Sequence, residues 1–184
     1  MSTVQVDTIN ESTTGSGVTV DGVLIKDGLV DGKDVSAITS GKVLQYVVAT
    51  NSTTQSTTST SYADITNLTA DITPSATSSK VLIIFNDNFW INRSSTSLGG
   101  TYIINKGGSD ITATTHGPAL IVDGNSGNKS LYGNNHFEYV DSPSTTSSTT
   151  YKVRFKASSG TAFYSQQGNR IASLILMELG VWLL

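Results

Sequence analysis

The stretch Lys80–Ile91 places an apolar side chain at every odd position from 81 to 91 except one, Asp87. Because successive side chains of a β-strand point to opposite faces, these odd positions would form one apolar face. Tyr151–Ala157 follows the same period of two, with Lys or Arg at each intervening position. The pattern predicts strands of antiparallel sheets that bury one face and leave the other in water.

The composition favours strands throughout the chain. Ser and Thr account for 52 of the 184 residues, and charged residues for 14%, against about 25% in ordinary soluble domains. Thr, Val, Ile, Tyr and Phe carry the structured stretches, and these residues suit a pleated, half-buried surface. Further strands are expected at Lys42–Ala49, Tyr62–Ile72, Thr101–Asn105, Leu120–Val122, Phe137–Val140, Thr161–Ser165 and Ile171–Leu179.

Turn-forming Gly, Asn and Ser residues separate these expected strands, and the Ser/Thr-rich stretch Thr50–Ser61 reads as a solvated loop. About eight or nine short strands broken by turns are typical of a β-sandwich or jelly roll. We therefore predict an all-β fold. Residues 41–184 would form a jelly-roll-like antiparallel β-sandwich, and residues 1–40 a short extended β segment in front of it.

Residues 1–40 contain three Asp-Gly pairs, the dipeptide that supplies the positive φ of tight turns. Very short strands would lie between these turns, and their apolar residues Val18, Val20, Val23 and Ile25 have no partner layer within the segment. Two interpretations remain open: a leader without fixed structure, or strands that bury these residues when several chains associate. We favour the second, which predicts a homotrimer with these four residues at its interface.

The expected closing strand, Ile171–Leu179, is largely apolar on both faces. Burial on both sides requires a second layer, which would be a neighbouring subunit of the trimer or an N-terminal stretch of the same chain. We assign Leu174 and Leu176 to the trimer interface. Glu178 would lie near buried surface and need a cationic partner or hydrogen bonds. The candidate cations are Arg170, Arg154 and Lys156.

Several classes of protein are excluded by simple counts. The chain contains no Cys, which excludes disulfides, thiolate metal sites and a cysteine nucleophile. Its net charge of −3 and the absence of a basic stripe argue against nucleic-acid binding. Residues 1–10 lack the pattern of a secretory signal, and no apolar run approaches the roughly 20 residues that cross a bilayer. We expect synthesis in the cytoplasm and no membrane insertion.

Residues that could support catalysis or metal binding form no familiar pattern. His116 and His136 lack the spacing of a zinc site, and residues 123–128 resemble half of a calcium loop without its central Gly and terminal Glu. No spacing singles out a pair of carboxylates for glycoside hydrolysis. The acids considered are Asp64, Asp71, Asp87, Glu138 and Asp141. We predict a protein that is not an enzyme and holds no metal or cofactor.

Several segments resemble structural proteins of tailed bacteriophages, in particular tail-fibre proteins of marine phages. Thr14–Gly28 is similar to a segment that recurs in these proteins, and Arg170–Leu179 to their closing strand. Shorter similarities follow in the same order at Ser61-Tyr62, Leu68, Ile72–Pro74, Ser79–Val81, Asp141–Pro143 and Thr150–Lys152.

This resemblance implies a virion protein with a β-sandwich knob, usually trimeric. Its N-terminal shaft or attachment segment, residues 1–40, would bind other tail or capsid proteins of the phage. Two alternatives stay open: a fibrous decoration on the phage head with the same architecture, and a free carbohydrate-binding module.

Aromatic residues near expected turns are candidates for contact with a glycan of the host surface. Recognition residues concentrate in such places, where rings can stack on sugars and amides can bond to hydroxyls. Trp90, Tyr102 and Tyr139 could also stack on sugars. The alternative is that most of these aromatic residues fill the core. The predicted contact residues are Tyr132, Asn134, Asn135, Tyr164, Gln166 and Gln167.

Overall fold

The computed structural model describes residues 18–20, 23–26, 29–30, 33–34, 43–93, 97–116, 121–122, 129–158, 161–165 and 170–180. In the segments before residue 43, and at residues 93, 97–98, 116, 121–122 and 129, it describes the backbone alone. The described residues form strands, turns and bends, with no helix among them. Accordingly, this part of the chain holds no helix long and apolar enough to cross a membrane.

The chain divides into two compact units, the second of which spans Lys42–Val181. The N-terminal unit contains a sheet of very short antiparallel strands in the order β1-β2-β3-β4. In the sequence an Asp-Gly pair, the dipeptide typical of tight turns, lies between each two successive strands. The strands are β1 (Val18–Val20), β2 (Val23–Lys26), β3 (Leu29–Val30) and β4 (Lys33–Asp34).

The short N-terminal β segment expected from the sequence is thus present. The predicted interface residues Val18 and Val20 lie in β1, and Val23 and Ile25 in β2. Their side chains lie outside the described residues, so their place at an interface stays a prediction.

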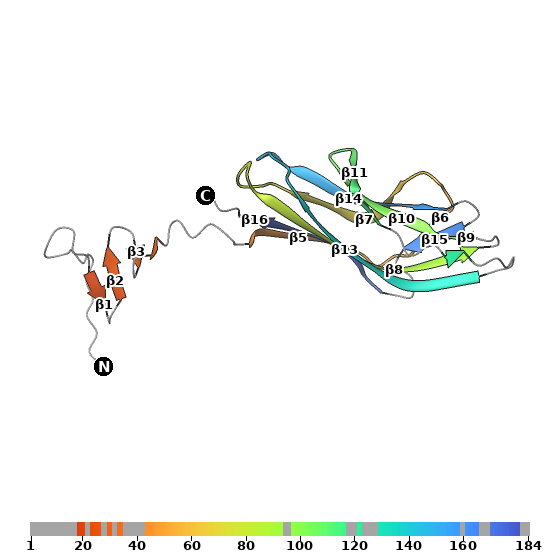
Figure 1. The fold of residues 1–184 in the computed structure, drawn as a ribbon, viewed down its shortest axis with the longest axis horizontal. Helices are drawn as coiled ribbons and strands as arrows, with labels where there is room; N and C mark the ends of the chain where they lie inside the picture. Colours follow the sequence, from red (N-terminus) through yellow and green to blue (C-terminus); the bar gives the residue numbers. More distant parts are fainter. Residues whose placement is uncertain are drawn as a thin grey trace. The chain divides into compact units, whose positions relative to one another are not determined.

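The second unit is a sandwich of two antiparallel sheets (Figure 1). One sheet has the order β11-β10-β14-β7. In the other, β8 pairs along its whole length with β13, and on its opposite side with β16 and then β15, which pair in turn with β5 and β6. A further short pair joins β9 to β12.

The bounds of these strands are β5 (Val43–Asn51), β6 (Gln55–Thr57), β7 (Ala63–Ile72), β8 (Lys80–Arg93), β9 (Ser97–Leu98), β10 (Gly100–Lys106), β11 (Ser109–His116), β12 (Ile121–Val122), β13 (Lys129–Asp141), β14 (Thr149–Ala157), β15 (Thr161–Ser165) and β16 (Ala172–Leu179).

The pairing confirms the predicted jelly roll. Strands at the two ends of the unit pair first, β5 with β16, and the pairs β7 with β14, β8 with β13 and β10 with β11 are nested inside. A long antiparallel ribbon of four such nested pairs, rolled into two sheets, is the jelly-roll fold. The strands of the four nested pairs are thereby divided between the two sheets, with β5, β16, β8 and β13 in one and β7, β14, β10 and β11 in the other.

The core lies between the sheets and is built from the positions that the period of two indicated. All five apolar odd positions of β8 are buried, as are the alternate positions of β14 and β16. Aromatic rings pack against each other at its centre, with ring centroids 5.0 Å apart for Phe85 and Tyr102 and 4.9 Å apart for Tyr102 and Phe163. Removing this apolar surface from water is the main stabilising term of the sandwich.

Strand β13 is much longer than the expected Phe137–Val140. The Gly-Asn-Asn segment at 133–135 suggests a turn, yet these residues lie in the middle of the strand. Gly133 faces Phe89 in the register with β8, and a Cβ atom there would come within 2.6 Å of the Phe89 ring. The glycine therefore serves close packing rather than chain reversal.

Three other strands of the second unit were not predicted, one of them the two-residue strand β9. β6 lies inside the Ser/Thr-rich stretch expected as a loop, and β11 has few apolar residues to reveal a period of two. β11 is nevertheless anchored by Thr114, whose Oγ1 accepts a hydrogen bond of 2.9 Å from the Ile104 amide and donates one of 2.7 Å to the Ile111 carbonyl.

Two carboxylates inside the sandwich are bound by tyrosine hydroxyls. Tyr102 donates to Asp87 at 2.7 Å, and Tyr151 donates to Asp141 at 2.6 Å. Burial, with the nearby Asp87 carboxylate, raises the pKa of Tyr102 well above its usual value, so the hydroxyl stays a donor. Lys106 also binds Asp141, at 3.0 Å. These two buried carboxylates are therefore paired across strands.

Glu178 is buried at the end of β16, and its partners among the described residues are hydroxyl and amide groups. Its Oε1 accepts hydrogen bonds from the amide of Ser75 (2.6 Å), the hydroxyl of Ser75 (2.6 Å) and the hydroxyl of Ser79 (2.7 Å). Burial alone would raise the pKa of Glu178, but these hydrogen bonds outweigh it and lower the pKa below its ordinary 4.5. Of the two kinds of partner expected, hydrogen bonds are the ones present, and they tie β16 to the β7–β8 connection.

Replacing Gly133 by Ala should lower the free energy of unfolding by about 1–3 kcal/mol, because the new methyl group overpacks the Phe89 ring. Urea unfolding of the two proteins measures the difference. Ser130→Ala, an exposed position on the same strand, should leave the unfolding free energy nearly unchanged. Equal stability of the Gly133→Ala protein would show that the contact is not restrictive.

Replacing Glu178 by Gln should lower the free energy of unfolding at neutral pH by about 1–3 kcal/mol, because the ionised carboxylate accepts three hydrogen bonds. A carboxyl whose pKa is lowered by folding stabilises the fold above its unfolded pKa and loses that contribution as pH falls through the folded value. The difference between wild type and variant should therefore shrink below pH 4.5. Urea titrations over a pH series measure it, and a difference independent of pH would contradict this role.

Candidate functional site

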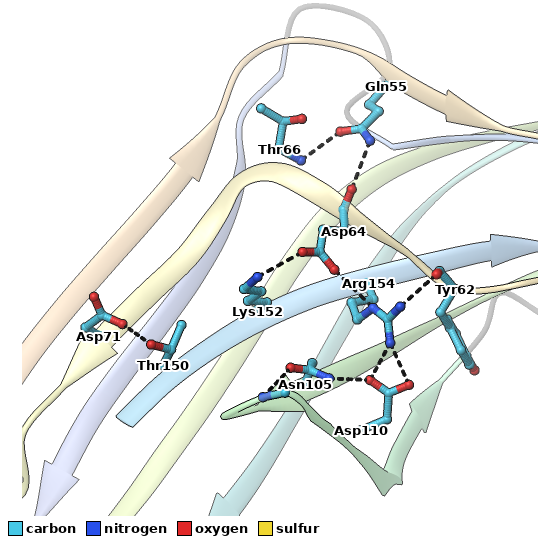
Figure 2. A network of polar contacts seen from close by, with 11 residues as sticks. Gln55, Tyr62, Asp64, Thr66, Asp71, Asn105, Asp110, Thr150, Lys152 and Arg154 are labelled. Atoms are coloured by element: carbon cyan, nitrogen blue, oxygen red, sulfur yellow. Dashed lines mark hydrogen bonds and ion pairs between the residues drawn. The ribbon is translucent and has the colours of Figure 1, made fainter. Parts of the chain in front are cut away.

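The outer face of the β11-β10-β14-β7 sheet carries charged side chains that form ion pairs and hydrogen bonds with one another (Figure 2). Arg154 on β14 donates two hydrogen bonds of 2.8 Å to the Asp110 carboxylate on β11, and a third to the Tyr62 carbonyl. Its Nε lies 3.0 Å from Asp64 on β7, and Lys152 lies 3.0 Å from the same carboxylate. One guanidinium thus links strands at both ends of the sheet.

Hydrogen bonding shifts the pKa values of Arg154 and Asp110. The hydrogen bond to Asp110 raises the pKa of Arg154. Burial would raise the pKa of Asp110, but hydrogen bonds from Asn105 and Arg154 outweigh it and lower the pKa. The charges on this face neutralise each other, which is the expected character of a sheet face that stays in water.

The outer face of the β8 sheet does not consist of paired charges. Side chains that lie opposite one another in register form rows across its strands, and these rows are apolar at one end of the sheet, then polar, then aromatic. At one end lie two rows, here called the apolar rows, that the registers of β5, β16, β8 and β13 bring together. Tyr46, Val48 and Val140 in them are 57%, 42% and 51% exposed. The apolar rows comprise Tyr46, Met177, Leu82 and Val140, then Val48, Ile175 and Ile84, with Glu138 at the end of the second.

A polar row separates the apolar rows from the rest of the face. It contains Thr50, Ser173, Asn86 and His136, which lie opposite one another in register. His136 Nδ1 lies 2.6 Å from Asn86 Oδ1, and Asn86 lies 3.5 Å from the Ser173 hydroxyl.

Beyond it lies a row of three stacked rings, here called the aromatic row. Tyr164 on β15, Trp90 on β8 and Tyr132 on β13 are opposite one another in register. The Trp90 ring centroid lies 4.3 Å from that of Tyr164 and 5.7 Å from that of Tyr132, with interplanar angles of 23° and 5°. Both faces of the indole are therefore covered by tyrosine rings.

The tyrosines at the two ends of the aromatic row each have one face turned away from Trp90. Among the described strands β13 pairs with β8 alone, so no strand lies beyond Tyr132, and Tyr132 is 63% exposed. Tyr164 faces Ser56 of β6 in register, a residue too small to cover a ring. Tyr164 is only partly exposed, so the more exposed end of the row, called its open end below, is Tyr132 at the sheet edge.

Uncharged hydrogen-bonding side chains flank the aromatic row on both sides. Ser130 and Asn134 precede and follow Tyr132 on the outward face of β13, and both are exposed. Asn92 and Asn88 occupy the equivalent positions on β8. The Asn88 side chain accepts a hydrogen bond of 3.0 Å from Arg170. The row therefore combines an apolar ring with amide and hydroxyl groups.

The structure brings together three of the six predicted contact residues and separates one. Tyr132, Asn134 and Tyr164 share the outward face. Asn135 is 5% exposed and faces Asp87 in register, so its predicted contact role is wrong; adjacent residues of a strand point to opposite faces. Gln166 and Gln167 lie outside the described residues.

Trp90, considered from the sequence as a ring that could stack on a sugar but not included among the predicted contact residues, lies at the centre of the aromatic row. Its even position in a stretch whose odd positions are apolar was the signal that it points outward.

The structure also contradicts the assignment of Leu174 and Leu176 to an interface. Both are fully buried in the core of the single chain. The outward positions of the same strand are Ile175 and Met177, in the apolar rows. The inner face of this strand packs in the core against the opposite sheet of the same sandwich, and so its cover there is neither a neighbouring subunit nor the N-terminal stretch that was the alternative.

The acidic residues considered for catalysis are bound separately. Asp64 is paired with Lys152, Asp141 with Lys106, and Asp71 accepts a hydrogen bond from Thr150. Within the described residues no three His, Asp or Glu side chains gather into a metal-binding group.

A small hollow of about 80 Å³ lies between β11 and β13, well below the roughly 300 Å³ of a ligand pocket. It is lined by Ala113, Thr114, Thr115, Phe137, Glu138 and Tyr139.

The fold defines the class of this domain as a jelly-roll β-sandwich. No family model matches the sequence, and no curated protein matches it. Among solved structures, a chain from the structure of infectious bursal disease virus, Gx strain, matches with a TM-score of 0.29 and 14% identity. The match covers 95% of this chain and 47% of that chain, so this chain spans about half the length of the chain it matches.

Proposed function

We propose that the protein is a structural component of a bacteriophage virion, of the tail-fibre type. Its N-terminal segment would attach it to the particle, and its jelly roll would face outward and contact the host surface. The observation that carries the proposal is the architecture of the chain, a meander of very short strands joined to a jelly roll. Jelly rolls recur in viral capsid and lectin domains, and the sequence segments similar to tail-fibre proteins support the same role.

Self-association is part of this proposal. The two outer faces of the sandwich differ, since one carries paired charges and the other carries the apolar rows. Large exposed apolar patches on soluble proteins mark interaction sites. A homotrimer would cover the apolar rows with neighbouring chains arranged around one axis, and closed symmetry is the rule among homo-oligomers.

Replacing Ile175 by Asp should convert the trimer into a folded monomer, because this side chain lies in the apolar rows on the outside of the sandwich. Light scattering should give about three times 19.4 kDa for the wild type and 19.4 kDa for the variant. Leu176→Asp, one residue away, should unfold the sandwich, because Leu176 is fully buried and an unpaired buried charge is costly.

Thr50→Asp is the matched control, since Thr50 is exposed on the same face but lies in the polar row. It should remain trimeric. A wild type that is monomeric at every concentration, or an Ile175→Asp variant that stays trimeric, would refute self-association through the apolar rows.

Deleting residues 2–20 should abolish incorporation into particles while the sandwich remains folded, because the sandwich is a separate compact unit. Antibody labelling in electron microscopy measures incorporation, and circular dichroism measures folding. Normal incorporation of the shortened chain would show that attachment does not depend on this segment.

The same labelling separates the alternatives. Label on the tail supports a fibre, label on the head supports a head decoration, and particles without label support a free carbohydrate-binding module.

A further inference from the structure

We infer that the open end of the aromatic row binds a neutral hexopyranose residue of a glycan, with the exposed ring face of Tyr132 as the stacking surface. The inference gives the proposed host contact a site and a ligand class. It rests on the proposed function for its biological setting alone, because sugar binding by the purified chain can be measured without the particle.

Tyr132 rather than Trp90 is the stacking ring. The indole is sandwiched between Tyr164 and Tyr132, at 4.3 and 5.7 Å, so neither of its faces can receive a ligand. Tyr132 is stacked on one side and lies in the edge strand of the sheet, at 63% exposure. A pyranose ring has faces made of C–H groups, which are complementary to the electron-rich face of an aromatic ring.

The surroundings of Tyr132 supply the second half of sugar recognition. Ser130 and Asn134, two residues to either side on the same strand face, are exposed. A hydroxyl and an amide both donate and accept hydrogen bonds, which is what the hydroxyls of a hexose require. Asn88 and Asn92 repeat this arrangement on β8. No side chain at these four flanking positions is itself charged, and the nearby guanidinium of Arg170 is hydrogen-bonded to Asn88, so the four positions offer a sugar neutral hydrogen-bonding groups.

The site is also held in place before any ligand binds. Tyr132 is fixed from behind by Trp90, and the next residue, Gly133, lies directly over Phe89 of the core. The ring therefore belongs to a paired strand of the sheet rather than to a loop, which reduces the conformational entropy lost on binding.

Stabilisation of the sheet is the competing explanation for the stack. Cross-strand aromatic pairs do stabilise sheets, and this accounts for Trp90 packed between its two neighbours. It does not require a ring at the sheet edge with one face open and most of its surface in water. The two explanations differ in whether removal of the Tyr132 ring affects sugar binding or folding alone.

The test is NMR titration of the full-length chain with cellotetraose, maltotetraose and β-1,4-galactotetraose. We expect at least one of these neutral tetrasaccharides to bind and to show saturation transfer from aromatic protons. Tyr132→Ala should weaken that binding about tenfold, equivalent to about 1.4 kcal/mol. Tyr132→Phe keeps the ring and should stay within about threefold of wild type, since stacking uses the ring face.

Two controls keep the result interpretable. Tyr62→Ala removes a tyrosine of the opposite sheet, whose ring contacts Lys156, and should leave sugar binding unchanged. If circular dichroism shows that Tyr132→Ala perturbs folding, the titration is made with Asn134→Ala instead. Loss of sugar binding in that variant supports the site equally.

Absence of binding to all three tetrasaccharides by the wild type would overturn the inference, as would equal losses in Tyr132→Ala and Tyr62→Ala. Particle labelling is read separately. A chain found on particles that binds no sugar refutes the site alone, and a chain that binds sugar but is absent from particles refutes the virion role alone.

Discussion

The pairing of β8 on both of its sides organises the rest of this protein. One strand of 14 residues carries β13 along one edge and both β16 and β15 along the other. Its odd residues face the core, where Phe85 meets Tyr102, and its even residues face outward, where Trp90 meets two tyrosines. Core and candidate site are therefore two faces of the same hydrogen-bonded ladder, and a shift of one residue would exchange them.

The two outer faces of the sandwich expose different kinds of side chain to water. Around Arg154, charged side chains pair with each other across the strands, and this face needs no further partner. The β8 sheet instead exposes Tyr46 and Val140 at one end and Tyr132 at the other, separated by the polar row that contains His136. The separation would allow one face to serve both proposed purposes, association through the apolar rows and ligand binding at the aromatic row.

Much of the fold could be predicted from local patterns, and the failures have physical causes. Strands such as Tyr151–Ala157 and Thr161–Ser165 follow from alternation, which is a property of the strand itself. β11 could not be found, because its stability comes from Thr114 and from pairing with β10 rather than from apolar residues. The Gly-Asn-Asn segment of β13 indicated a turn because these residue types are common in turns. The actual reason for Gly133 is its contact with the Phe89 ring, a residue far away in the sequence, which local turn propensity does not reveal.

By itself, the sequence determined which residues share a face, because the two-residue period is built into the extended backbone. It placed Leu174 with Leu176 and Ile175 with Met177, and it put Trp90 opposite the apolar positions of its strand. The tertiary structure alone decided which face of β16 is inside, and it alone brought residues 90, 132 and 164 into one row. Strand register depends on hydrogen bonds between segments far apart in the chain, so no local pattern contains it.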